Sequence, residues 1–168
     1  QRDGNSTTIS VSNAENTNSF EQQREKFKKE ARRLRSLSNP HIVKVYDLFE
    51  ENGTAYYVMD YVDGENLSTR LKRTNASLAE SEVRNYLNQI LDGLEAIHNE
   101  GMFHLDIKPA NIMVDSHDVV KLIDFGASKQ QSTVGGATMS TGISYTNGYA
   151  PSEQMAQIYD KFGPWTDF

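Results

Sequence analysis

Apolar residues recur at helical spacing in two long stretches of the chain. The first begins with the capping-box pattern Ser19–Gln22 and ends at Asn39-Pro40, and the second begins with Ser77–Glu80 and ends at Gly101. Because the apolar positions of each stretch fall on one face at 3.6 residues per turn, both are predicted to be core-facing helices. These positions are Phe20, Phe27, Ala31, Leu34 and Leu37 in the first, and Val83, Tyr86, Leu87, Ile90, Leu91, Leu94 and Ile97 in the second.

Short β-branched and aromatic runs predict two hairpins. Residues Ile42–Phe49 and Thr54–Tyr61 are joined around Asn52-Gly53, a strong signal for a tight hairpin turn. Residues Ile112–Val114 and Val119–Ile123 flank a run of turn-forming residues. Between the two hairpins, Leu67–Arg73 suits a short helix.

The second predicted hairpin carries candidate chemistry at its open end. Asn111 enters this hairpin and Asp124 leaves it, so both side chains are expected at the same end. A carboxylate and a carboxamide oxygen suit a hard cation that keeps several waters and bridges phosphates. In the preceding loop, Asp106 and Lys108 are two residues apart and face the same side if the loop is extended. Asp106 can then accept a hydroxyl proton while Lys108 stabilises a transferring phosphoryl group.

The segment His104–Asn111, followed by Asp124-Phe125-Gly126, resembles the catalytic loop and metal-binding motif of protein kinases. The resemblance implies an α+β, bilobal kinase-like fold, with ATP and Mg²⁺ as cofactors. It implies that Asp106 is the catalytic base, that Lys108 contacts the γ-phosphate, and that Asn111 and Asp124 hold Mg²⁺. The alternative interpretation is a surface hairpin with ordinary turn acids.

One residue of this segment departs from the family pattern. Leu105 stands where the family usually has an Arg, which commonly pairs with a phosphate on the activation loop. Because Leu cannot form that pair, we expect no strict need for activation-loop phosphorylation. By the same resemblance, His104 is a packed structural residue that touches Phe125, with no proton-transfer role.

The resemblance extends to a nucleotide-binding region. The run Val58–Gly64 resembles the kinase hinge, which implies that Met59 is the gatekeeper, that Asp60 to Val62 contact adenine, and that Asn66 lies near the ribose. Glu30 lies on the apolar face of the first helix. The resemblance implies that it pairs with a strand Lys above the phosphates. The alternative is a rim residue satisfied by Arg33 or by solvent.

The long polar stretch 127–149 lies where the activation segment belongs. Residues 145–153 resemble its closing Ala-Pro-Glu region, with Ser152 where Pro is usual and with Glu153 in the Glu position. Thr146 matches the Thr that hydrogen-bonds the catalytic Asp and Lys in kinases acting on Ser and Thr. The alternative is a Pro-fixed surface without such a partner. Asp167 matches an Asp that anchors the catalytic-loop backbone. Candidate phosphosites by location are Ser128, Ser132, Thr133, Thr138, Ser140 and Thr141.

Composition narrows the class of protein. The net charge of −6 argues against a nucleic-acid partner, and the absence of cysteine excludes a disulfide framework. No apolar run approaches the length of a membrane span, so we expect no membrane contact within this segment and a cytoplasmic location.

Parts of the family pattern are missing from the sequence. We find no Gly-rich loop and no strand Lys before the helix that holds Glu30. We therefore expect a fragment truncated at both ends, with a loop or disordered lead-in at 1–18, part of the small lobe at 19–61 and part of the large lobe at 62–168. Without the helices after Asp167, Leu87, Ile90 and Leu94 should be partly exposed and Glu153 should be unpaired. The isolated fragment should be inactive, and unstable or self-associating.

The function implied by the resemblance is ATP-dependent phosphoryl transfer to protein Ser or Thr hydroxyls, within a longer enzyme of the bacterial Ser/Thr kinase type. Such enzymes serve bacterial signalling. The first alternative is a non-catalytic kinase-like binding or scaffold module, which the missing parts and Leu105 favour. A second alternative is a small-molecule kinase of the same fold. The intact set of Asp106, Lys108, Asn111 and Asp124 supports the enzyme.

Overall fold

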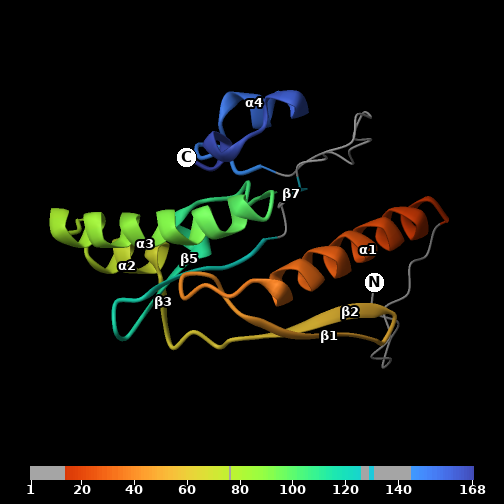
Figure 1. The fold of residues 1–168 in the computed structure, drawn as a ribbon, viewed down its shortest axis with the longest axis horizontal. Coiled ribbons are helices and arrows are strands. Elements are labelled where there is room, and N and C mark those ends of the chain that lie inside the picture. Colours follow the sequence, from red (N-terminus) through yellow and green to blue (C-terminus); the bar gives the residue numbers. More distant parts are fainter. Residues whose placement is uncertain (1–13, 76, 126–128, 131–144) are drawn as a thin grey trace. The chain divides into compact units, whose positions relative to one another are not determined.

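The computed structural model describes residues 14–75, 77–125, 129–130 and 145–168 and divides the chain into two compact units (Figure 1). The first unit takes the chain up to Ser38 together with Lys44–Tyr61, and the second takes Asn39–Val43 and Val62–Phe168. Residues 39–43 were expected with the first unit. They belong to the second because the Val43 N–H donates to the Leu122 carbonyl (3.0 Å) and the Leu122 N–H donates to that of His41 (2.8 Å).

The first unit consists of one helix and one antiparallel hairpin. Helix α1 (Ala14–Ser36) packs against β1 (Val45–Glu51) and β2 (Thr54–Met59). The hairpin turn is confirmed, since Asn52 and Gly53 both have positive φ, 52° and 76°, as a two-residue turn of this kind requires. Ala31 and Leu34 of the helix are buried. The Phe27 and Tyr57 rings stack at 4.9 Å between centroids and join the helix to the hairpin.

The start of α1 differs from the prediction. The helix begins at Ala14, five residues before the capping pattern at Ser19, so the expected lead-in of 1–18 is partly helical. Once a helix is nucleated, each further residue costs little to add, and a local capping pattern does not by itself stop extension toward the N-terminus.

The second unit is built around helix α3 (Glu80–Asn99), with the short helix α2 (Leu67–Arg73) formed as predicted. Helix α3 begins three residues after Ser77, because Ser77 belongs to the turn after α2, where its N–H donates to the Thr74 carbonyl (3.2 Å). The Glu82 carboxylate instead accepts the Ala79 N–H (3.1 Å) at the helix start.

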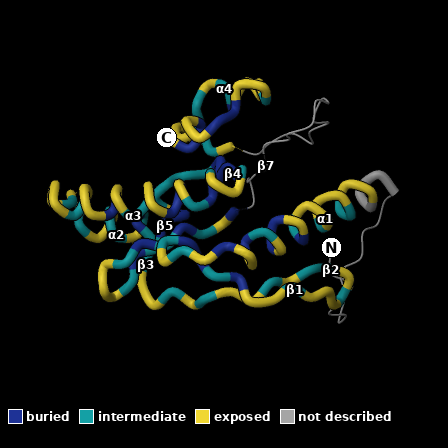
Figure 2. Tube along the Cα trace, viewed as in Figure 1, coloured by how far each residue is buried: buried dark blue, intermediate teal, exposed yellow. Residues whose placement is uncertain are grey.

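The apolar stripe of α3 is buried along only part of its length. Tyr86, Leu94 and Ile97 are buried, whereas Leu87 is 49% exposed. The expected exposure of Leu87 is therefore confirmed, but that of Leu94 is wrong, because α3 packs against β4 and β6 at this end. The buried positions of this unit gather around β4, β5 and the facing side of α3 (Figure 2).

The second predicted hairpin is confirmed as β5 (Ile112–Asp115) and β6 (Val120–Leu122), which pair antiparallel. The sequence did not predict the third strand of this sheet, β3 (Gly64–Asn66), which pairs with β5. Gly64 is required there, since a Cβ at this position would lie 2.0 Å from the Val114 carbonyl oxygen. The remaining pair, β4 (Met102–Phe103) and β7 (Lys129–Gln130), was also not predicted.

Short helical segments complete the described chain: single 3₁₀ turns at Pro109–Asn111, Tyr159–Lys161 and Pro164–Asp167, and helix α4 (Ser152–Met155). The candidate phosphosites and most of the predicted activation segment lie outside the described residues. Among the helices that the structure describes, none has the length and hydropathy needed to cross a membrane.

Candidate functional site

Three polar side chains of the second unit meet at the loop formed by His104–Asn111. The Lys108 ammonium lies 2.7 Å from Asp106 Oδ2 and donates to Thr146 Oγ1 at 2.9 Å. The Thr146 hydroxyl in turn donates to Asp106 Oδ1 at 2.7 Å. Thr146 is 40 residues from Asp106 in the sequence, so tertiary folding places it here. The three side chains form a closed polar triangle around one carboxylate.

Asn111 joins this carboxylate to the open end of the β5–β6 hairpin. Its amide Nδ2 donates to Asp106 Oδ2 (2.8 Å) and to the Asp106 carbonyl (2.9 Å). Its backbone carbonyl accepts from the Ile123 N–H (3.0 Å), which places Asp124 at the adjoining position. Among the described residues, no donor reaches Asn111 Oδ1. The carboxamide oxygen is therefore available to a cation beside Asp124.

The electrostatic environment keeps Asp106 ionised. Its partial burial alone would raise the pKa, but hydrogen bonds from Lys108, Thr146 and Asn111, with the charge of Lys108, hold the pKa below the ordinary value of an aspartate. At neutral pH the carboxylate is therefore a permanent acceptor with defined oxygen directions. This suits a group that orients a hydroxyl and takes its proton during transfer.

Two buried side chains hold the backbone of this loop by hydrogen bonds. Asp167 Oδ2 accepts the His104 N–H (2.9 Å) and Asp167 Oδ1 accepts the Leu105 N–H (2.7 Å), which confirms the predicted anchor. The Gln154 amide donates to the Leu105 carbonyl at 2.6 Å, and His98 Nε2 lies 2.8 Å from Asp167 Oδ2. Neither Gln154 nor His98 was singled out for this role, because Gln154 is 49 residues from Leu105, His98 is 69 residues from Asp167, and neither matched a motif.

His104 is fully buried and has a structural role. Its Nδ1 accepts the Asp106 N–H (3.3 Å), and its Nε2 contacts the Ile123 carbonyl (3.2 Å), an arrangement that requires a neutral ring. Burial also lowers the pKa of His104, which agrees with the neutral form. The ring packs on Phe125 at 4.6 Å between centroids, as predicted.

The side chain of Leu105 is buried in apolar surroundings. It is 3% exposed and packs with Phe103 and Phe162, against which Tyr159 is also packed. Its φ of 63° lies in the left-handed region, which is costly for a branched side chain and is held here by the surrounding contacts.

The residues predicted to bind nucleotide lie in both units, and each is described within its own unit. In the first unit, the Asp60 N–H donates to the Lys44 carbonyl (2.9 Å) and Met59 is 43% exposed. Glu30 is buried near Arg33. Burial lowers the pKa of Arg33, and the negative charge of Glu30 offsets only part of that effect. The proximity of these two side chains favours the alternative interpretation, in which Arg33 satisfies Glu30. It does not test whether Glu30 pairs with a Lys on a strand.

In the second unit, Val62 is half-buried and lies two residues before the start of β3. Asn66 has an unpredicted structural role, because its Oδ1 caps α2 by accepting the Thr69 N–H at 2.9 Å. The predicted contacts of these two residues with a nucleotide remain predictions.

Glu153 was expected to lack the Arg with which the family pairs it, and among the described residues no cation contacts it, but its carboxylate does have hydrogen-bond partners. Its carboxylate accepts from the Thr166 hydroxyl (3.3 Å) and from Ser152 (3.5 Å). The Thr166 hydroxyl also accepts the Gly163 N–H (3.1 Å), so Glu153 is tied to the same terminal segment that holds the Asp167 anchor.

The donor set fits Mg²⁺ bound with few protein ligands. No group of three or more His, Cys, Asp or Glu side chains able to hold a metal occurs in the described part of the chain. Mg²⁺ needs no such group, since it commonly binds one or two carboxylates, waters and substrate phosphates. Asn111 and Asp124 at the hairpin mouth supply a carboxamide and a carboxylate, which are suitable oxygen ligands.

Comparison with known proteins agrees with this geometry. The protein kinase domain profile matches residues 2–167. The chain is 38% identical over 148 residues to serine/threonine-protein kinase B of Synechocystis, covering 83% of this chain and 26% of that protein. It is 40% identical over 124 residues to mitogen-activated protein kinase kinase kinase 2 of Arabidopsis thaliana, covering 72% of this chain and 19% of that protein.

A solved structure, the apo form of PpkA-294, superposes with a TM-score of 0.78 at 31% identity, covering 95% of this chain and 55% of that one. The α+β kinase-like fold is thereby confirmed, over part of a kinase domain. The chain spans about a fifth to a quarter of the curated relatives named here. Proteins of this family generally use ATP and Mg²⁺ and act on protein substrates. The chain belongs to the protein kinase family.

Proposed function

We propose that this chain is the central part of a Ser/Thr protein kinase catalytic domain of the type found in bacteria. The observation that carries the proposal is the triangle of Asp106, Lys108 and Thr146, in which two donors converge on one ionised carboxylate. A kinase-like binding module has no evident need for this arrangement.

In the proposed reaction, Asp106 accepts the proton of a substrate Ser or Thr hydroxyl as its oxygen bonds to the γ-phosphorus of ATP. The bond between that phosphorus and the bridging oxygen breaks, and ADP leaves. Lys108 offers its positive charge to the transferring phosphoryl group. Asn111 and Asp124 would hold Mg²⁺, which would neutralise phosphate charge when bound. Glu30, Met59, Asp60, Val62 and Asn66 are the proposed nucleotide contacts.

The substrate side of the site is a pocket next to the carboxylate. Its volume is about 230 Å³, and its lining includes Asp106, Thr146, Tyr149 and Pro151. Thr146 belongs to both the triangle and the pocket, so a polypeptide bound there would lie beside the base. This supports a protein substrate over a small molecule.

The test compares two variants of the full-length protein. Asp106→Asn should retain Mg²⁺-dependent nucleotide binding but lower phosphoryl transfer by about 10²- to 10⁴-fold, because the proton acceptor is lost. Asp124→Ala should lose the Mg²⁺-dependent part of nucleotide binding. Radiolabelled γ-phosphate transfer and equilibrium nucleotide binding measure the two effects. If the unmodified protein binds nucleotide but transfers nothing to any protein or peptide, the non-catalytic alternative is correct.

A further inference from the structure

A second pocket, of about 380 Å³, lies on the second unit beside the catalytic loop. Its lining residues are Ser68, Leu71, Lys72, Asn75, Pro109 and Tyr149. The first four follow one another at helical spacing, so a single face of α2 and its continuation form one side. The functional assignment above does not use this pocket.

The pocket shares its supporting segments with the catalytic triangle. Pro109 directly follows Lys108, and the Tyr149 N–H donates to the Thr146 carbonyl at 3.1 Å. Both Lys108 and Thr146 contact Asp106. An extended peptide advances about 3.3–3.6 Å per residue. One substrate chain can therefore offer a hydroxyl to Asp106 and place a neighbouring side chain in this pocket.

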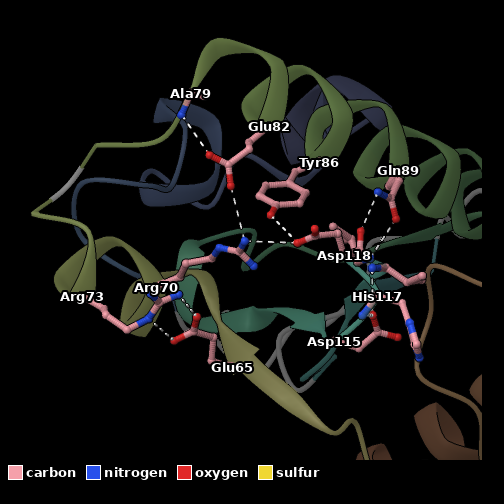
Figure 3. A network of polar contacts seen from close by, with 12 residues as sticks. Glu65, Arg70, Arg73, Ala79, Glu82, Tyr86, Gln89, Asp115, His117 and Asp118 are labelled. Carbon is pink, nitrogen blue, oxygen red and sulfur yellow. Dashed lines mark hydrogen bonds and ion pairs between the residues drawn. The ribbon is translucent and has the colours of Figure 1, made fainter.

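The pocket carries a positive charge that no acidic lining residue neutralises. Of the three cations in the last turn of α2, Arg70 contacts Glu82 (3.3 Å) and Asp118, and Arg73 contacts Glu65 (2.7 Å) (Figure 3). The third, Lys72, has no carboxylate partner among the residues that the structure describes. No acidic residue lines the pocket, so Lys72 supplies its one formal charge.

The other lining groups complement an anion. Ser68, Asn75 and Tyr149 carry hydroxyl or amide groups that can donate hydrogen bonds, while Leu71 and Pro109 offer apolar surface to an aliphatic stem. Asn75 has a φ of 54°, a left-handed conformation that Asn tolerates better than most residues. A Lys in a last helical turn also interacts with the helix dipole, but that role requires no adjoining pocket.

We propose that this pocket binds an anionic side chain of the protein substrate, so that the enzyme selects Ser or Thr acceptors with an Asp, a Glu or an already phosphorylated residue nearby. The proposal rests on the proposed kinase function and adds the class of substrate. A carboxylate and a phosphate share the chemistry that Lys72 and the neighbouring donors recognise.

The first test measures binding without catalysis. Fluorescent peptides carry Ala at the acceptor and a single Glu or phosphoserine, moved from about four residues before it to about four after it. Each is compared with a Gln peptide by anisotropy on the full-length protein. At one position the anionic peptide should bind about 10-fold more tightly. Lys72→Gln should abolish this difference, and Lys72→Glu should reverse it in favour of a Lys peptide. Arg84→Glu, at an exposed position of α3, is the matched charge-reversal control.

The second test uses the same peptides with Ser restored and measures the ratio of kcat/KM between anionic and Gln peptides. This ratio should fall to near one in Lys72→Gln and persist in Arg84→Glu. A preference that survives Lys72→Glu, or no anionic preference in either test, overturns the proposal. Phosphoryl transfer without the preference refutes this inference alone. Lys72-dependent binding without transfer to any peptide supports the pocket and refutes the kinase function. Comparing Glu with phosphoserine distinguishes acidic from previously phosphorylated substrates.

Discussion

The carboxylate of Asp106 has three side-chain donors, from Lys108, Asn111 and Thr146. Two of them come from the same short loop, while the third arrives from a segment 40 residues away. The protonation state of Asp106 therefore depends on the hydrogen bond from Thr146, which lies in the predicted activation segment. Each donor favours the ionised form, so removing any one should raise the pKa of Asp106.

Under the proposed kinase function, Thr146→Val should shift the pH dependence of phosphoryl transfer. Losing its hydrogen bond raises the lowered pKa of Asp106, so protonation begins at higher pH and the acidic limb of kcat/KM moves to higher pH. We also expect about 10-fold lower kcat/KM at neutral pH. Thr146→Ser, which keeps the hydroxyl, should restore the acidic limb. An unchanged limb in Thr146→Val would contradict this role.

Leu105 predicts independence from activation-loop phosphate. The buried packing of Leu105 against Phe103 and Phe162 holds the loop without an Arg–phosphate pair. Phosphatase treatment of the full-length enzyme, checked by mass spectrometry, should leave most of its activity. Loss of activity after complete dephosphorylation would show that another cation reads a phosphate there.

At the scale of elements, the β3–β5–β6 sheet positions the open end of the β5–β6 hairpin, where Asn111 and Asp124 lie. Gly64→Ala should destabilise this sheet by about 1–3 kcal/mol, because the added Cβ would meet the Val114 carbonyl at 2.0 Å. Gly101→Ala is the control, because a Cβ added there would meet no atom within 4 Å. This substitution should cost only the backbone strain of an alanine at φ +66°, about 1 kcal/mol. Chemical denaturation followed by circular dichroism measures both. Equal effects of the two substitutions would argue against the close β3–β5 approach.

A polar network joins α2, α3 and the closed end of the β5–β6 hairpin (Figure 3). Arg70 contacts Asp118 at 3.1 Å and lies over the Tyr86 ring, and the Tyr86 hydroxyl donates to Asp118 at 2.9 Å. This network fixes the hairpin from the end opposite to Asn111 and Asp124.

Tyr86 makes stability sensitive to alkaline pH. Burial and the hydrogen bond to Asp118 raise the pKa of Tyr86 to about 12. The folded state thus favours the neutral phenol, so the stabilisation is complete below the unfolded pKa of about 10 and is lost as pH rises from there toward 12. The free energy of unfolding should fall more steeply between about pH 10 and about pH 12 in the wild type than in Tyr86→Phe. Parallel slopes in urea denaturation would contradict the raised pKa.

At the scale of the whole molecule, exposed apolar surface on α3 predicts self-association. Val83, Leu87 and Leu91 are 48%, 49% and 37% exposed along this helix. The isolated chain of residues 1–168 should therefore increase in apparent mass with concentration in light scattering, and Leu87→Gln with Leu91→Gln should reduce the effect. A monodisperse, cooperatively melting sample would contradict this expectation.

Much of the architecture could be predicted from local pattern. Hydrophobic periodicity located the helices, and Asn52-Gly53 fixed the first hairpin because its turn needs two residues of positive φ. Helix starts were less predictable, since capping signals at Ser19 and Ser77 compete with helix extension and with neighbouring turns. Strand β3 was missed because its three residues, Gly64–Asn66, carry no periodic signal, and only pairing with β5 makes them a strand.

The sequence by itself determined which groups are the candidates for the proposed chemistry, because Asp106, Lys108 and Asn111 fall within one short loop whose spacing already restricts their directions. Only the tertiary structure decided how that loop is held. The Gln154 amide binds the backbone of the loop from 49 residues away, and a contact at such separation leaves no local pattern in a chain. The Asp167 anchor was expected only from the family resemblance.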